Sequence, residues 1–337
     1  MKLREIGNSG IKAPVVAFGA WAIGGWMWGG TEEQESINAL NTAIDNDMNF
    51  IDTAPVYGYG VSEEIIGKAI KGKREKVILA TKCGLRWNLD KPEGTLHFYS
   101  TDTGVSKEKT SKPVYKYLNP KSIRYEIEQS LKRLQTDYID LYQTHWQDTT
   151  TAIADTMAEL NKLKDEGKIR AIGVSNASTT QMDGYGDIQA DQEKFNMFQR
   201  KSESQGKLEY CKSKGIAFLA YSPLAQGLLT GKMKSRQSFP HSDVRNYNPL
   251  FSPENIKKVN LMLEDWKPLC EKHNADLGQI TAAWTFEYSG VTHVLLGTRT
   301  VEQALRNAKA GDIQLEHEDI KIINTSYEKY FSKTEVA

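Results

Sequence analysis

The sequence lacks the features that mark membrane-spanning, secreted and metal-binding proteins. None of its apolar runs approaches the roughly 18 residues that a transmembrane helix needs, and the opening MKLREIGNSG has no apolar signal-peptide segment. The cysteines Cys83, Cys211 and Cys270 are odd in number and form no CxxC or Cys/His set, so neither disulfides nor structural zinc are expected. We therefore expect a cytoplasmic protein without a metal.

A net charge is also absent. Lys and Arg together number 43, and so do Asp and Glu. Without a field of one sign, nothing indicates binding to nucleic acid or to an anionic membrane, and the sequence leaves the oligomeric state open. The 337 residues are enough for two average domains or for one large α/β barrel.

What the chain has is a regular alternation of short apolar strands and amphipathic helices. Strand patterns lie at 15–19, 49–52, 76–82, 138–143, 169–175, 187–192, 215–222 and 291–297. Helical patterns lie at 31–47, 62–70, 120–135, 151–167, 178–184, 202–215, within 254–288 and at 300–311. Near-continuous apolar strands that alternate with helices are typical of a parallel sheet covered on both faces. Eight such units predict one domain over residues 1–337, an α/β fold of the (β/α)₈ TIM-barrel type with a β-hairpin at 1–14.

Two long connections, 84–119 and 225–253, each follow a predicted strand. In a (β/α)₈ barrel such loops lie on the C-terminal face, where active sites are built. An uninterrupted loop of this length is usually functional or mobile. We expect both to border an active site, although 84–119 also fits a surface excursion with its own small core.

Polar residues at the ends of barrel strands are the catalytic candidates. Asp52, Lys82 and His145 close successive strands, and Tyr57 follows Asp52 by five residues. Asp52 and Lys82 end neighbouring strands, which predicts a buried ion pair. A cation beside Tyr57 is expected to lower the phenol pKa toward neutrality and make it a general acid, while His145 orients a carbonyl oxygen. Each residue alone also has a structural explanation, so their joint occurrence carries the prediction.

The segment GYGVSE at 58–63 imitates a dinucleotide-binding GxGxxG motif. Its last position is Glu63, and a carboxylate there would repel a pyrophosphate. We expect the two glycines to allow a tight turn into the next helix instead.

Several long motifs resemble those of the aldo-keto reductases. They are IDTAPVYGYGVSEEIIGKAI, VILATK, LKRLQTDYIDLYQTHW, GKIRAIGVSN, AYSPLAQGLLTGK and GTRTVEQALRN. Within that family the chain resembles the bacterial branch of general-stress and inositol-operon reductases. The resemblance covers nearly the whole chain and implies an NAD(P)H-dependent carbonyl reductase with the tetrad Asp52, Tyr57, Lys82 and His145.

The resemblance also implies how the cofactor is held. Ser175, Asn176 and Gln192 match residues that bind the carboxamide, and Tyr221 matches the aromatic residue that stacks on the nicotinamide. The segment Ser222, Pro223, Leu224, Gln226, Gly227 and Leu228 would wrap the pyrophosphate, and Gly297, Thr298, Arg299, Gln303 and Asn307 match the adenosine end. The planar fork of Arg299 suits a 2′-phosphate, so NADP(H) is favoured over NAD(H); alone, Arg299 also fits a solvated helix start.

The substrate side is the least determined. Trp26, Trp28, Trp87 and Trp146 are candidates for an aromatic substrate wall, although GGWMWGG also fits simple packing over the barrel mouth. The expected substrate is a small aldehyde or ketone, for which sugar-derived compounds are candidates. The alternatives are a sugar or polyol dehydrogenase and a cofactor-binding regulatory subunit of the same fold.

Overall fold

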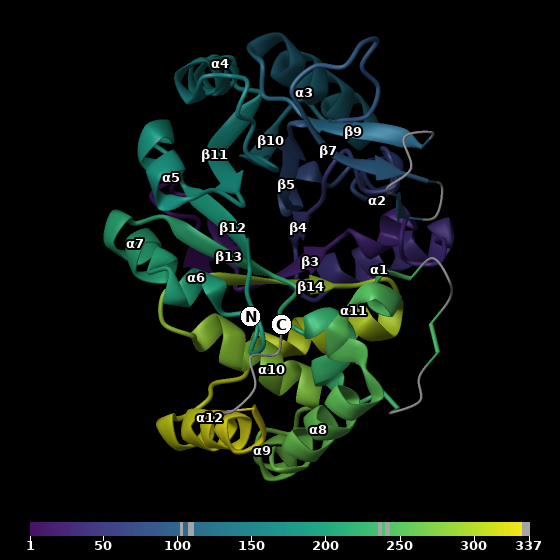
Figure 1. Ribbon diagram of the computed structural model, residues 1–337, viewed down its shortest axis with the longest axis vertical. Helices are drawn as coiled ribbons and strands as arrows, with labels where there is room; N and C mark the ends of the chain where they lie inside the picture. Colours follow the sequence, from purple (N-terminus) through teal and green to yellow (C-terminus); the bar gives the residue numbers. More distant parts are fainter. Residues whose placement is uncertain (102–103, 107–110, 235–237, 240–242, 332–337) are drawn as a thin grey trace.

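Eight parallel strands close into a barrel that helices surround, which confirms the predicted (β/α)₈ TIM-barrel fold (Figure 1). The computed structural model describes residues 1–101, 104–106, 111–234, 238–239 and 243–331. Parts of the two expected active-site loops, 84–119 and 225–253, therefore lie outside the described residues. Strands that follow one another along the chain are neighbours in the barrel, and the last barrel strand pairs with the first.

The barrel strands are short and mostly buried. They are β3 (Val16–Gly19), β4 (Phe50–Asp52), β5 (Ile78–Cys83), β10 (Ile139–Thr144), β11 (Ile169–Ser175), β12 (Ala190–Lys194), β13 (Ala217–Tyr221) and β14 (His293–Gly297). Apolar side chains such as Phe50, Leu141 and Leu219 form one buried cluster with Ile6 and Ile11 of the N-terminal hairpin. That hairpin, β1 (Leu3–Glu5) and β2 (Lys12–Pro14), is also as predicted.

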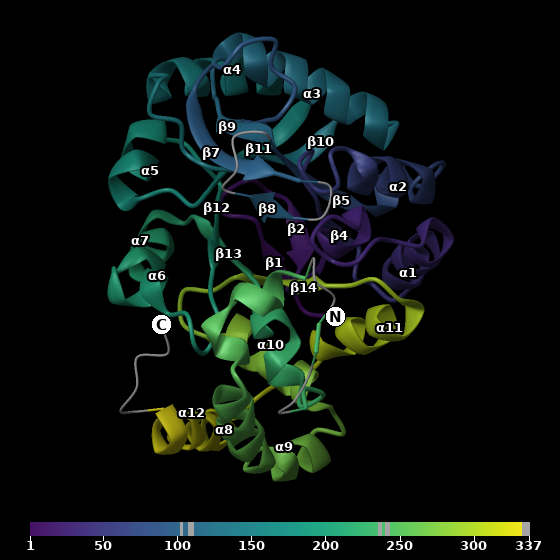
Figure 2. The same ribbon diagram turned by 45° about the vertical axis from the view of Figure 1, so that its right-hand side comes forward.

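Twelve α-helices are present in the described residues. They are α1 (Glu33–Asp45), α2 (Val61–Ala69), α3 (Pro120–Leu134), α4 (Ile153–Asp165), α5 (Thr179–Tyr185), α6 (Lys201–Ser204), α7 (Lys207–Lys214), α8 (Pro253–Glu264), α9 (Lys267–Lys272), α10 (Leu277–Glu287), α11 (Val301–Ala310) and α12 (His317–Phe331). Figures 1 and 2 both show α8, α9 and α12 grouped at one end of the molecule. None of the described helices is long and apolar enough to cross a membrane.

Helix α3 shows how local sequence sets these elements. The side chain of Asn119 caps its first turn by accepting a hydrogen bond from the backbone N–H of Lys121, and Pro120 occupies the first helical position. Ile123 and Ile127, four residues apart, are buried against the barrel. The helix ends where Gln135 adopts a left-handed conformation.

Residues 84–119 form a small antiparallel sheet rather than an uninterrupted loop. Its strands are β6 (Leu85–Arg86), β7 (Thr95–Ser100), β8 (Val105–Ser106) and β9 (Lys112–Lys116), in the spatial order β6-β9-β7-β8. Leu85 and Val114 share a separate apolar cluster with Ala54 and Val56 of the β4–α2 loop. The excursion is therefore a folded sheet, and its apolar cluster is shared with the β4–α2 loop.

Two helical features differ from the sequence prediction. Helix α12 is not among the predicted elements. Its side chains Ile323 and Phe331 are buried. The single helix predicted at 202–215 is divided into α6 and α7, because Gly206 adopts a left-handed conformation (φ 70°) between them.

The glycine-rich segment after β4 is a turn, as expected. Gly58 has φ 66°, and a Cβ there would lie 2.1 Å from the carbonyl oxygen of Gly24. Glu63 does not face a nucleotide, because its carboxylate accepts hydrogen bonds from Thr81 and Arg133 and is fully buried. The resemblance to GxGxxG therefore reflects only backbone geometry.

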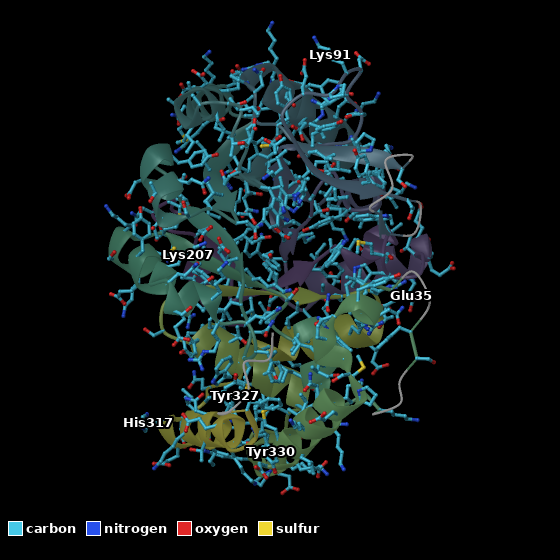
Figure 3. The ribbon with its side chains drawn as sticks, viewed as in Figure 1. Glu35, Lys91, Lys207, His317, Tyr327 and Tyr330 are labelled. Atoms are coloured by element: carbon cyan, nitrogen blue, oxygen red, sulfur yellow. The ribbon has the colours of Figure 1, made fainter. Side chains whose placement is uncertain are left out.

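Strand β12 carries a buried acidic pair on the face opposite to Gln192. Asp191 is fully buried, and its carboxyl oxygens find no hydrogen-bond donor among the described residues. Glu193 forms an ion pair with Lys207 of α7, which Figure 3 labels. Burial and the negative charge of Glu193 raise the pKa of Asp191 well above its usual value.

Because of the buried Asp191 carboxyl group, we expect the stability of the folded protein to depend on pH. Since folding raises the pKa of Asp191, the folded state binds an extra proton, and stability falls as pH rises from the unfolded value near 3.8 through the folded one. Asp191→Asn should raise the free energy of unfolding by about 1–3 kcal/mol at about pH 8, measured by urea denaturation. The control Asp165→Asn changes an exposed carboxylate on α4 and should show no such gain. A destabilised Asp191→Asn protein would contradict the argument.

Candidate active site

A fully buried lysine lies at the centre of the barrel mouth. The Nζ atom of Lys82 is 3.0 and 2.8 Å from the two carboxylate oxygens of Asp52 and donates to the carbonyl oxygen of Thr53 at 2.8 Å. It lies 3.2 Å from the hydroxyl of Tyr57. The predicted ion pair is therefore present, and the predicted tyrosine adjoins it.

Strand pairing brings these groups together. Asp52 ends β4 and is opposite Ala80 of β5 in the parallel ladder. Lys82 is two residues beyond Ala80 and so projects from the same face of the sheet. Tyr57 stands just before a tight turn, in which Gly58 and Tyr59 have left-handed backbone conformations. This turn leads into α2, and the Tyr57 side chain remains beside the lysine.

The charges at this site do not shift the pKa of Tyr57 in the expected direction. Burial raises that pKa well above 10.0, and the nearby carboxylate of Asp52 raises it further. Burial also lowers the pKa of Lys82, although Asp52 opposes this shift. The expectation that Lys82 brings the phenol toward neutrality is wrong, because burial, and next the carboxylate of Asp52, raise the phenol pKa. At neutral pH Tyr57 therefore keeps its proton.

His145 directly follows β10 and faces the tyrosine. The rings of Tyr57 and His145 lie 5.8 Å apart, edge to face. The pKa of His145 is lowered well below 6.5, first by burial and then by the charge of Lys82 and by His97. The imidazole is therefore neutral and can donate one N–H bond.

Two glutamines complete the surroundings of Asp52. The Nε2 atom of Gln192 donates to Asp52 Oδ1 at 2.7 Å, and that of Gln143 lies at 3.4 Å. Gln192 is expected to bind the carboxamide, but here its amide donates to the carboxylate of Asp52. Gln143 is not among the predicted residues; its place within β10, two residues before His145, is a signal that could have indicated it.

The other carboxamide candidates form a connected network. The Nδ2 atom of Asn176 donates to Ser175 Oγ at 2.9 Å and to the carbonyl oxygen of His145 at 3.1 Å. The hydroxyl of Tyr221 donates to Asn176 Oδ1 at 3.0 Å. Residues from β11, β13 and the end of β10 are thereby held together beside the tetrad.

One elongated cavity of about 760 Å³ joins the tetrad to the start of α11. Of the predicted residues, its lining includes Asp52, Tyr57, His145, Trp26, Trp28, Trp146, Ser175, Asn176, Gln192, Tyr221, Ser222, Pro223, Leu224, Gln226, Gly227, Gly297, Arg299 and Gln303. The lining residues that the sequence analysis missed include Trp21, Met27, His97, Lys232, Arg245 and Arg306. Of these, Trp21 and Met27 lie in the same aromatic run as Trp26 and Trp28, which is a usable signal.

Some predicted residues lie behind the cavity wall or beside it. Trp87 packs against Tyr59, with ring centroids 5.3 Å apart, and is not part of the lining. Leu228 is fully buried in the outer core. Asn307 donates to the hydroxyl of the buried Thr298 at 3.0 Å, so both support the wall from behind.

At the far end of the cavity, Arg299 forms hydrogen bonds to residues 21–30, which carry Trp21, Trp26 and Trp28 and are called the tryptophan loop below. Its two terminal nitrogens donate to the carbonyl oxygens of Trp28 (2.9 Å) and Gly30 (2.7 Å). Its backbone N–H donates to the side chain of Gln303, in the first turn of α11. Lys232 and Arg306 also line this end of the cavity, where Glu302 lies 3.9 Å from Lys232, and Arg306 lies 3.6 Å from Asp276.

Metal-dependent chemistry has no ligand set in the part of the chain that is described. There, no three His, Cys, Asp or Glu side chains are arranged to hold a metal ion. Cys83 is buried next to Lys82, but burial raises its thiol pKa well above 9.0, so it is not a reactive thiolate.

A parallel barrel with this ion pair, phenol and imidazole at its mouth has the architecture of a nicotinamide-dependent oxidoreductase of carbonyl and alcohol groups. The Aldo/keto reductase family matches residues 15–328 of the chain. The chain belongs to this family, and it is an NAD(P)H-dependent oxidoreductase.

Individual relatives share almost the full length. The aldo-keto reductase YhdN of Bacillus subtilis is 38% identical over 98% of this chain and 95% of its own length. The NADH-specific methylglyoxal reductase of Escherichia coli is also 38% identical, over 96% of this chain and 97% of its own. Among solved structures, the glycerol dehydrogenase AKR11B4 from Gluconobacter oxydans superimposes with a TM-score of 0.85 at 35% identity, covering 98% of this chain and 96% of that one.

Proposed function

We propose that the protein reduces an aldehyde or ketone to the alcohol with NADPH, and that Tyr57 is the proton donor. The observation that carries this proposal is the phenol hydroxyl of Tyr57, 3.2 Å from the buried ammonium group of Lys82 at the mouth of an open cavity. The bound cofactor supplies a hydride to the carbonyl carbon. The side chains of the protein supply the proton and orient the carbonyl group.

The residues of the site divide this work between them. A carbonyl oxygen between Tyr57 and His145 accepts hydrogen bonds from the phenol and from the neutral imidazole. As negative charge develops on that oxygen, the phenol proton transfers to it and the O–H bond of Tyr57 breaks. Lys82 stabilises the phenolate that is left, because the ammonium group donates directly to its oxygen. The phenolate then regains a proton from water.

The cavity fits a nicotinamide dinucleotide. It continues from the tetrad along Ser222–Gly227, where Ser222, Ala225 and Gln226 have positive φ values of 57°, 47° and 56°. Such a distorted backbone can turn its N–H groups toward an anion. Asn176 and Tyr221 would hold the nicotinamide end. Arg299, with Lys232 and Arg306, would meet the adenosine phosphate, which favours NADPH.

Polyol oxidation on the same site is the second candidate. It is supported by the likeness to the glycerol dehydrogenase AKR11B4. Oxidation requires Tyr57 to accept a proton and so to be ionised first. Since burial raises the pKa of Tyr57, the protonated phenol dominates at neutral pH, and this favours reduction. The regulatory-subunit alternative would require the same cavity to bind cofactor without turnover.

Replacing the phenol tests the proton donor. Tyr57→Phe should slow single-turnover oxidation of bound NADPH by an aldehyde about 10²–10⁴-fold, measured by stopped-flow fluorescence. Cofactor binding should remain, because Tyr57 lies at the tetrad end of the cavity. The matched control is Tyr59→Phe on the same loop, whose phenol bonds Ser100 rather than Lys82; it should keep most of the rate. A Tyr57→Phe enzyme with full activity would disprove the assignment.

Replacing the arginine tests the cofactor preference. Arg299→Ala should lower kcat/KM for NADPH about 10–100-fold more than for NADH, since a hydrogen-bonded charge pair with the 2′-phosphate is lost. Lys309→Ala, at an exposed position on the α11 helix that follows Arg299, is the control. An equal loss with both cofactors would show that Arg299 serves only to hold Trp28 and Gly30.

A further inference from the structure

Strand β7 of the small antiparallel sheet places a histidine in the cavity that the proposed mechanism does not use. His97 lines the same cavity as Tyr57 and His145. Its ring lies 4.8 Å from that of Trp146, the residue that follows His145. The influence of His97 on the pKa of His145 also reflects this closeness. His97 is thus a neighbour of the reaction centre contributed from outside the barrel.

A β-bulge aims this side chain. Leu96 pairs with Tyr115 of β9, and Phe98 pairs with the next residue along β9, Val114. His97 therefore has no partner of its own on β9 and is the bulged residue. In a regular strand adjacent side chains point to opposite faces, yet His97 and Phe98 both line the cavity. Bulges redirect single side chains and are frequent beside active sites.

The environment of His97 leaves its polar atoms available. Its ring contacts in the described residues are the aromatic rings of Phe98 and Trp146, and neither ring nitrogen has a hydrogen-bond partner there. Burial, and next the charge of Lys116, lower its pKa to about 4. At neutral pH the imidazole therefore offers one N–H donor and one acceptor nitrogen.

The wall around it is otherwise apolar. From the described part of residues 84–119, the lining consists of Leu85, His97 and Phe98, and Trp26 stacks on Phe98 at 5.9 Å. A simple alkyl group would satisfy this wall but would leave the imidazole without a partner once water is displaced. A polar group in a cavity costs free energy when it is desolvated without a hydrogen bond.

We infer that His97 binds a second oxygen atom of the substrate, so that the enzyme prefers hydroxy- or oxo-substituted aldehydes and ketones to simple alkyl ones. The inference rests on the proposed reduction of carbonyl compounds and adds the chemical class of the substrate. His97 is here a specificity residue: it contacts the substrate away from the reacting oxygen, which Tyr57 and His145 hold.

The test compares two aldehydes of similar size, glyceraldehyde and butanal, with saturating NADPH. The wild-type protein should show the higher kcat/KM for glyceraldehyde. His97→Phe keeps an aromatic ring against Trp146 but removes both polar atoms, so it should lower kcat/KM for glyceraldehyde about 10-fold, mainly through a higher KM. The value for butanal should hold or rise. His97→Asn, which retains a donor and an acceptor, should restore most of the preference.

A histidine remote from the cavity is the control. His317 lies at the exposed start of α12, at the end of the molecule where α8, α9 and α12 gather (Figure 3). His317→Phe should leave both substrates unaffected. If His97→Phe slows glyceraldehyde and butanal equally, the inference is wrong while the proposed reductase function stands. If the wild-type protein reduces neither aldehyde nor any other carbonyl compound, both are wrong.

Discussion

The buried ion pair between Lys82 and Asp52 is the interaction on which the site depends. Taking an ammonium group and a carboxylate out of water costs several kcal/mol per ion in effective terms, and removing either partner leaves the other charge uncompensated. The structure offsets this cost with further hydrogen bonds: Thr53 accepts from Lys82, while Gln192 donates to Asp52. The neighbouring parallel strands β4 and β5 hold these two groups together, and the hydroxyl of Tyr57 lies 3.2 Å from the same ammonium group.

Different parts of the chain build the cavity. The barrel provides the tetrad and the network of Ser175, Asn176 and Tyr221, whereas the antiparallel sheet of residues 84–119 provides His97 and Phe98. Arg299 lies at the other end of the cavity, just before α11, and holds the backbone of the tryptophan loop. In the proposed complex, a phosphate bound by Arg299 would compete with these carbonyl oxygens and would thereby couple cofactor binding to the position of Trp28.

Much of this arrangement can be predicted from the sequence. The eight apolar strand patterns and the polar residues that end them follow from periodicity, because parallel strands buried on both faces have little freedom in composition. The sheet in residues 84–119 does not follow, since its strands are short and half-exposed and its polar composition resembles that of a loop. The bulge at His97 depends on pairing with β9, and such pairing is not local. The pKa of Tyr57 depends on the burial of the phenol and on its closeness to the carboxylate of Asp52, which only the three-dimensional structure gives.

The proposed mechanism requires that Lys82 acts on the reaction through Tyr57. The most direct measurement is a double-mutant cycle of Lys82→Met and Tyr57→Phe on the single-turnover rate of NADPH oxidation. We expect the two losses of rate to be strongly non-additive. In the Tyr57→Phe protein, Lys82→Met should slow the reaction little further, because the two groups act as one unit. Full additivity of the two losses would show that Lys82 and Tyr57 act independently, and would contradict the account.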